Sequence, residues 1–323
     1  MPPKTKAPKA RKAASADLAA LVGRMRDGDR RATSRVVTEL ERLSPDLPAL
    51  MQELGPHLGH AEVVGFTGPP GAGKSTLVNA YTSHLRQAGK SVGIIAVDPS
   101  SPVSGGAILG DRIRMPATLD DDGVFMRSLA SRGHLGGLCP AAVRVIDGLD
   151  AAGKDAILLE TVGTGQSEID VAEVADVRVV VMAPGLGDDI QAMKAGLLEI
   201  ADIMVVNKAD REGADRTLSQ LAGAASLRMG TRAKATVLKT TATTGDGIAA
   251  LAEAIAAAVA RRGEVDHRER RRRRARYLIA RAAADHISER IRAGRHRGLD
   301  ALADKVLTGQ LLPAEAARRL LDP

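Results

Sequence analysis

The chain has 323 residues, of which 44% are hydrophobic and 1% aromatic, and its formal net charge is +7. That length allows one large domain with appendages, or two domains, with a core built mainly from aliphatic residues. The single cysteine, Cys139, excludes an internal disulfide and favours a reducing, cytoplasmic setting. No apolar run is long enough to cross a membrane, so we expect no membrane partner.

The first 60 residues contain two kinds of sequence. Residues 1–16 hold basic side chains and no acid, and they are interpreted as a disordered tail. The tail lacks the apolar centre of a secretory signal; an organelle transit peptide is the alternative, because such peptides are also basic. Residues 17–60 place apolar side chains at helical spacing, which predicts a helical extension. The first such face consists of Leu18, Leu21, Val22 and Met25.

A glycine-rich stretch stands between a predicted strand, Val63–Thr67, and a predicted helix, Thr76–Gln87. It matches G-x-x-x-x-G-K-[ST], the phosphate-binding loop of nucleotide triphosphatases. We expect its backbone N–H groups and the helix N-terminus to bind phosphate. Lys74 would reach the β- and γ-phosphates, and Ser75 would ligate Mg²⁺. The nucleotide-binding residues are Gly68, Pro69, Pro70, Gly71, Ala72, Gly73, Lys74, Ser75 and Thr76.

Beyond this loop, short apolar runs alternate with helical patterns. Runs that are largely continuous in apolar residues are typical of strands covered on both faces. Residues 61–262 are therefore expected to form a doubly wound α/β domain with a mostly parallel sheet, whose ligand binds at the carboxyl ends of the strands. The further predicted strands are Val92–Val97, Val124–Met126, Ala156–Leu159, Val177–Met182, Ile203–Val206 and Thr236–Lys239.

Two loops after predicted strands indicate which base is bound. The first is Asn207-Lys208-Ala209-Asp210, which is N-K-x-D, the guanine-reading tetrapeptide. The Asp210 carboxylate has two acceptor oxygens for two parallel donors of guanine that adenine lacks. We expect Asn207 to tie this loop to the phosphate loop and Lys208 to cover the base. In the second loop, the backbone N–H groups of Thr241, Ala242 and Thr243 are candidates for binding the guanine carbonyl.

Acidic residues near other predicted strand ends predict a magnesium site beside Ser75. Mg²⁺ takes oxygen ligands and waters, which Asp98, Asp111 and Glu160 can supply or hold. Glu160 stands where GTPases usually carry the Asp of D-x-x-G, and Gly163 is the glycine whose N–H meets the γ-phosphate. Each acid alone could be a solvated surface residue, but their joint placement favours the metal site. Lys74, Glu160 and Gly163 are the catalytic candidates.

Together these motifs resemble the ArgK/MeaB family of GTPases, part of the SIMIBI class that is marked by a glutamate at the place of Glu160. The resemblance runs from about Asp17 to the C-terminus. It implies a chaperone that binds GTP or GDP with Mg²⁺ and hydrolyses GTP. Such a chaperone regulates cofactor loading and protection of an adenosylcobalamin-dependent mutase of the methylmalonyl-CoA mutase type. The resemblance also places Asp188 and Lys194 in a further switch segment.

Residues 263–323 are expected to form a C-terminal helical arm. Glu264–Arg292 is predicted to be a long helix, and further helices are predicted near Leu299 and from Pro313. The resemblance implies that this arm makes a homodimer. The arginine run Arg268–Arg276 is interpreted as a solvated helix face. We expect no nucleic-acid partner, because aromatic residues for base stacking are scarce and no nucleic-acid module is recognised.

Two other functions stay open at this stage. One is an ATPase or kinase that energises amino-acid transport, the LAO/AO label sometimes given to this family, although Asp210 argues against ATP. The other is a metal-insertion GTPase. Proteins of that kind often carry histidine-rich tracts or cysteine pairs, and neither occurs in this sequence.

Overall fold

The computed structural model describes residues 8–98, 121–130, 140–161, 171, 173–185, 199–226, 235–261, 267–294 and 298–321. The chain divides into two compact units, residues 1–274 and 275–323, and each is described by itself. The C-terminal arm was expected to begin at residue 263. The observed boundary is later because the first turns of helix α13 (His267–Arg292) bind residues of the first unit, as Arg274 does at Val174.

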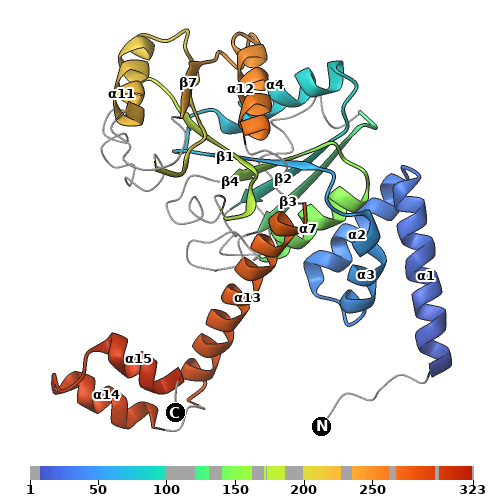
Figure 1. The fold of residues 1–323 in the computed structure, drawn as a ribbon, viewed down its shortest axis with the longest axis vertical. Coiled ribbons are helices and arrows are strands. Elements are labelled where there is room, and N and C mark those ends of the chain that lie inside the picture. The colour runs from blue at the N-terminus through green and yellow to red at the C-terminus, as the bar shows by residue number, and fades with distance from the viewer. Residues whose placement is uncertain are drawn as a thin grey trace. The chain divides into compact units, whose positions relative to one another are not determined.

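The described residues of the first unit form a sheet of seven parallel strands in the order β3-β2-β4-β1-β5-β6-β7 (Figure 1). This confirms the predicted α/β class with its parallel sheet. Because the strands run the same way, their carboxyl ends meet at one edge, and β1 lies centrally between β4 and β5. The strands are β1 (Glu62–Thr67), β2 (Val92–Asp98), β3 (Val124–Ala130), β4 (Ala156–Thr161), β5 (Val177–Met182), β6 (Ile203–Val206) and β7 (Thr236–Lys239).

Helices cover both faces of this sheet, which explains why most residues of its strands are apolar. α4 (Lys74–Gln87) and α12 (Ile248–Arg261) pack together on the face that includes Ile94 (Figure 1). α7 (Pro140–Ala151) packs on the other face, since a Cβ at the neighbouring Gly93 would lie 2.9 Å from a Leu149 methyl carbon. α11 (Ala214–Ser226) packs against β6 and β7.

The predicted N-terminal extension consists of α1 (Pro8–Arg26), α2 (Arg30–Arg42) and α3 (Leu47–Leu54), followed by a 3-10 turn at Gly55–His57. The three helices bury one apolar cluster, and α2 packs closely on α7. α2 begins after Asp29, whose carboxylate accepts hydrogen bonds from two main-chain N–H groups of its first turn.

The start of α1 differs from the sequence expectation. The helix begins at Pro8, inside the segment 1–16 that was expected to be disordered. Alanine is the strongest helix former, and alanines recur from Ala10 to Ala16, so the helix can extend toward the N-terminus despite the basic charge.

The second unit contains the rest of α13, with α14 (Leu299–Leu307) and α15 (Pro313–Leu321), in agreement with the helices predicted there. α14 and α15 pack together, and Leu311 and Leu320 are buried. The interpretation of Arg268–Arg276 as a solvated face is wrong in part, because Arg274 is only 5% exposed. Among the described helices, none combines the length and the apolar character that a membrane span needs.

Candidate functional site

The phosphate loop joins the carboxyl end of β1 to α4, at the edge of the sheet where the strands end. Gly68, Gly71 and Gly73 have φ angles of 137°, 79° and 87°, which residues with a Cβ rarely adopt. A Cβ on Gly68 would lie 2.1 Å from Val181 O of β5, and one on Gly73 would lie 2.5 Å from Asn207 Nδ2. The glycines are therefore required for close backbone approach to β5 and to the loop after β6.

Lys74 is the first residue of α4, and only 7% of it is exposed. Its Nζ donates hydrogen bonds to Gly68 O at 2.8 Å and to Pro69 O at 3.0 Å. The ammonium group is thus held against carbonyls of the phosphate loop. A phosphate oxygen would replace these neutral acceptors with a charged one and form a stronger bond. Pro70, Gly71 and Thr76 are exposed around this position, and Ala72 is buried.

Ser75 and Glu160 meet beside the phosphate loop. Ser75 Oγ donates to Glu160 Oε1 at 2.6 Å, and Glu160 is 5% exposed. β4 continues to Thr161, so Glu160 is the penultimate residue of the strand and pairs in register with Phe66 of β1, rather than following the strand as the sequence analysis expected. A hydroxyl and a carboxylate brought together here are hard oxygen donors that fit Mg²⁺, which is commonly held by one or two carboxylates plus waters and substrate phosphates.

Asn207 links the phosphate end of the site to the base end, and it is 1% exposed. Its Nδ2 donates to Ala72 O at 3.0 Å and to Gly73 O at 3.3 Å, which is the predicted contact with the phosphate loop. Its Oδ1 accepts from Thr240 Oγ1 at 3.1 Å and from Ala242 N at 3.2 Å. Thr240 was missed as a positioning residue; the only signal for it was its place directly after β7.

The base-side loops lie next to one another, since Ala209 N donates to Thr240 O at 3.0 Å. Lys208 has a left-handed φ of 57°, and its Nζ donates to Gly71 O at 2.7 Å. Asp210 and Thr243 are exposed, whereas Thr241 is buried and its N–H donates to Asp246 O at 2.9 Å. The Asp210 carboxylate is therefore accessible to a ligand at this edge of the sheet.

Several predicted site residues fall outside the described parts of the chain. These are Asp111, Gly163, Asp188 and Lys194. Asp98 is described only as the last residue of β2, so the structure gives no account of its side chain. Within the described residues, no group of three or more His, Cys, Asp or Glu side chains could hold a metal ion.

Comparison with known proteins places this chain in a family. The family model for the methylmalonyl-CoA mutase-associated GTPase MeaB matches residues 33–296. A Pyrococcus horikoshii protein, described as a candidate GTPase, is 50% identical over 241 residues, which are 73% of this chain and 75% of that protein. GTPase ArgK of Escherichia coli is 43% identical over 199 residues, 60% of each chain.

Among solved structures, the crystal structure of a LAO/AO transport system kinase is similar with a TM-score of 0.73 and 26% identity, covering 95% of this chain and 97% of that one. The parallel sheet, the glycine loop and the guanine-type loops agree with these matches. The chain belongs to the MeaB family of methylmalonyl-CoA mutase-associated GTPases.

Proposed function

We propose that this chain binds GTP with Mg²⁺ at the carboxyl edge of the sheet and hydrolyses it to GDP and phosphate. We further propose that this cycle regulates cofactor loading and protection of an adenosylcobalamin-dependent mutase of the methylmalonyl-CoA mutase type. The observation on which the nucleotide assignment rests is Asn207, whose buried carboxamide bonds the phosphate loop on one side and Thr240 and Ala242 on the other. The family description supports the choice of mutase.

At the phosphate end, the backbone N–H groups of Gly71 to Thr76, which exclude the two prolines of the loop, would surround the triphosphate, and Lys74 would bind its β- and γ-phosphates. Ser75 and Glu160 would hold Mg²⁺, which would supply positive charge to offset the charge of the phosphates. Phosphoryl transfer leaves a protein little covalent chemistry, so these residues act by positioning and by stabilising charge. From the sequence, Asp98 and Asp111 complete the metal surroundings, and the Gly163 N–H binds the γ-phosphate.

At the base end, the exposed Asp210 carboxylate accepts the two parallel donors of guanine. The Lys208 stem lies along the base while its ammonium group is anchored on Gly71 O. The backbone N–H groups of Thr241, Ala242 and Thr243 are proposed to approach the guanine carbonyl; of these, the Thr241 N–H and the Ala242 N–H already donate to Asp246 O and Asn207 Oδ1. Thr243 is therefore the best placed of the three for a direct contact.

The second unit supports the proposed homodimer. Leu307 and Leu312 are 84% and 72% exposed, and Ile279 is 69% exposed. Large apolar side chains that remain exposed are typical of interaction surfaces where they gather, and we propose that these residues take part in one. By resemblance, Asp188 and Lys194 belong to a further switch that responds to nucleotide. The single cysteine supports work in a reducing, cytoplasmic setting.

An ATP-dependent transport kinase is the competing assignment, favoured only by the name of the structurally similar LAO/AO protein. Adenine offers no donor pair to Asp210, so ATP would leave that carboxylate without its partners. A metal-insertion GTPase is less well supported, because the described residues contain no His, Cys or acidic cluster for a metal cargo.

Nucleotide competition separates these assignments. We expect the wild type to prefer GTP strongly over ATP. Asp210→Asn should weaken GTP binding by about 10- to 100-fold, because it removes a charged acceptor of two hydrogen bonds. Glu212→Gln changes an exposed acid two residues away and should leave binding unaltered. Equal affinity of the wild type for ATP and GTP would favour the transport kinase.

The proposed client is tested by co-purification. The wild type loaded with a non-hydrolysable GTP analogue, or with GDP, is mixed with an adenosylcobalamin-dependent methylmalonyl-CoA mutase. We expect retention that depends on which nucleotide is bound, and cofactor transfer to the mutase that requires GTP. Failure to retain the mutase in any nucleotide state would remove the chaperone assignment while leaving the GTPase assignment intact.

A further inference from the structure

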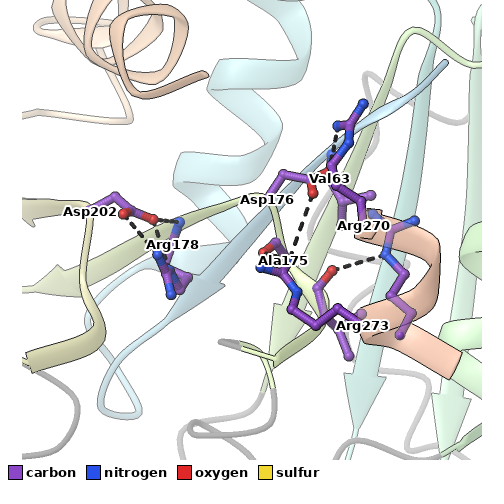
Figure 2. Close-up of polar contacts among 9 residues, drawn as sticks. Val63, Ala175, Asp176, Arg178, Asp202, Arg270 and Arg273 are labelled. Carbon is purple, nitrogen blue, oxygen red and sulfur yellow. Dashed lines mark hydrogen bonds and ion pairs between the residues drawn. The ribbon is translucent and has the colours of Figure 1, made fainter. Parts of the chain in front are cut away.

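Asp176 lies directly before β5, at the end of the sheet opposite the phosphate loop, and it is 3% exposed. Two arginines of α13 donate to its Oδ2, namely Arg270 Nη1 and Arg274 Nη2, each at 3.2 Å. Arg273 Nη2 lies 3.8 Å from Oδ1. Figure 2 shows Arg270 and Arg273 extending from α13 toward this carboxylate. We call Asp176, Arg270, Arg273 and Arg274 the Asp176 latch.

The latch also binds main-chain carbonyls of the segment before β5. Arg273 Nη2 donates to Ala175 O at 2.9 Å, and Arg274 Nε donates to Val174 O at 3.1 Å. The three arginines stand at i, i+3 and i+4, so they share one face of the helix. All of them lie in residues 267–274, the part of α13 that belongs to the first unit. This face of α13 is therefore bonded to the base of the sheet.

Asp176 is equally bound to the first residues of β1. Val63 N donates to Asp176 Oδ2 at 3.0 Å, and Asp176 N donates to Val63 O at 2.7 Å. The other end of β1 runs directly into Gly68, which lies against Val181 O of β5 so closely that a Cβ would come within 2.1 Å. The β1–β5 pair is thus held by Asp176 at one end and forms one wall of the phosphate loop at the other.

The latch contains three cations and one anion, so we expect the binding of α13 to Asp176 to respond to changes in nearby charge. All three guanidinium groups lie within 4 Å of the Asp176 carboxylate, while Glu173 also acts on Arg273 and Asp147 on Arg274. Burial lowers the pKa of Arg273; Asp176 opposes this, and the cations of Arg274 and Arg178 add to it. A buried ion pair gains little over its desolvation cost even with good geometry. Repulsion between the guanidinium groups of Arg273 and Arg274 adds to this cost, so we expect the bound and released arrangements of α13 to differ little in free energy.

We propose that Asp176 is a positioning residue for nucleotide binding, which it affects by holding the first turns of α13 against the β1–β5 pair that forms the phosphate loop. The proposal rests on the GTPase function proposed above. Closing the latch aligns β1 with β5, and opening it alters the affinity for guanine nucleotide. Because coupling between two equilibria is reciprocal, bound nucleotide must in turn change how firmly α13 is held. α13 runs from His267 to Arg292, and the arginines of the latch stand in its first turns.

The experiment compares two ways of opening the latch with a matched control. Asp176→Asn keeps the shape of the side chain and an acceptor for Val63 N, but it removes the charge. Arg270→Gln/Arg274→Gln removes both α13 hydrogen bonds to Asp176 and the bond to Val174 O; it keeps the bond from Arg273 to Ala175 O and those of Asp176 to β1. Asp202→Asn removes the charge of an acid that pairs with Arg178 of β5 at 2.8 Å, in the same strand that Asp176 precedes (Figure 2).

Dissociation constants and release rates are measured with fluorescent GDP and with a fluorescent non-hydrolysable GTP analogue, alongside the melting temperature. We expect both latch variants to change nucleotide affinity by about fivefold or more, and Asp202→Asn to change it by less than about twofold although it also lowers the melting temperature. Hydrogen exchange at residues 268–274 should slow when GDP is added to the wild type and not when it is added to Asp176→Asn.

Three results would overturn the proposal. One is unaltered nucleotide affinity in both latch variants, and another is an equal change in Asp202→Asn. The third is an effect of Asp176→Asn that Arg270→Gln/Arg274→Gln does not reproduce, which would assign the effect to β1 alone. If Asp176→Asn does not fold, the arginine variant and the hydrogen exchange of the wild type decide. Absence of any guanine-nucleotide binding by the wild type would overturn the GTPase assignment as well as this one.

Discussion

At the scale of single residues, Lys74 gives the most direct test of the phosphate site. Lys74 is 7% exposed, and its ammonium group is bonded to Gly68 O and Pro69 O. Lys74→Ala removes the charge that would bind the β- and γ-phosphates, so we expect single-turnover GTP hydrolysis to fall by about 100-fold or more. Lys90→Ala changes an exposed lysine before β2, at the opposite edge of the sheet, and should have no effect. Unchanged turnover in Lys74→Ala would contradict the site.

A second residue, the partly buried Asp147 of α7, contributes to the pH dependence of stability. Burial raises the pKa of Asp147 to about 6, and the cations of Arg274 and Arg271 oppose the rise only in part. A raised pKa means that the folded state disfavours the charged carboxylate, so the stability present below about pH 4 is lost as pH rises toward 6. Asp147→Asn avoids this penalty and should be more stable than the wild type by about 2–3 kcal/mol at pH 7.5, with little difference at pH 4.

Chemical denaturation of both proteins from pH 4 to pH 8 measures this difference. Asp121→Asn serves as a control of opposite sign, because the hydrogen bond from Arg86 holds the pKa of Asp121 below its usual value. Stability from Asp121 is present at neutral pH and lost as pH falls, so its variant should be the less stable one at pH 7.5. A stability gain for Asp147→Asn that is independent of pH would show that burial of charge is not its cause.

At the scale of elements, the glycines of the phosphate loop differ in how well each would tolerate a Cβ. Gly68→Ala places a Cβ 2.1 Å from Val181 O and also strains a φ of 137°. Gly71→Ala strains a φ of 79° but meets no atom within 4 Å. We expect Gly68→Ala to abolish nucleotide binding and Gly71→Ala to cost only about 1–2 kcal/mol of stability. Melting curves and nucleotide titrations test this order; equal effects would mean that the contact with β5 does not shape the loop.

The strands show what a sequence can predict about elements. Strands β5, β6 and β7 have the predicted bounds; β6 is apolar throughout, β5 is interrupted only by Arg178, and β7 has a polar residue at each end. β4 was predicted two residues too short, since Glu160 and Thr161 are polar and were placed in the loop. Their burial follows from contacts that sequence periodicity does not report: Ser75 binds Glu160, and Thr161 Oγ1 donates to Thr67 Oγ1 at 3.4 Å.

At the scale of the whole molecule, a contact between distant residues could be predicted from the sequence only where the order of strands and loops brings the two residues together. The loop of Asn207 was expected to meet the phosphate loop because both follow strands of one parallel sheet, and Asn207 does bond Ala72 and Gly73. The arginines of α13 had no such guide. Arg274 and Asp176 are 98 residues apart, and nothing in the spacing of either identifies the other, so the run was interpreted as solvated.

From the exposed leucines of the second unit we predict that two copies of the chain associate. Leu307, the last residue of α14, and Leu312, which directly precedes α15, are exposed, whereas Leu311 and Leu320 are buried, and we propose the two exposed leucines as part of a dimer surface. Leu307→Glu/Leu312→Glu places two charges on this surface, and we expect a shift from dimer to monomer in sedimentation equilibrium, because burying an unpaired carboxylate costs several kcal/mol. Leu43→Glu alters a leucine of the first unit that is 60% exposed and should leave the dimer intact. A wild type that is monomeric at all concentrations, or a double variant that still dimerises, would show that these leucines do not form the interface.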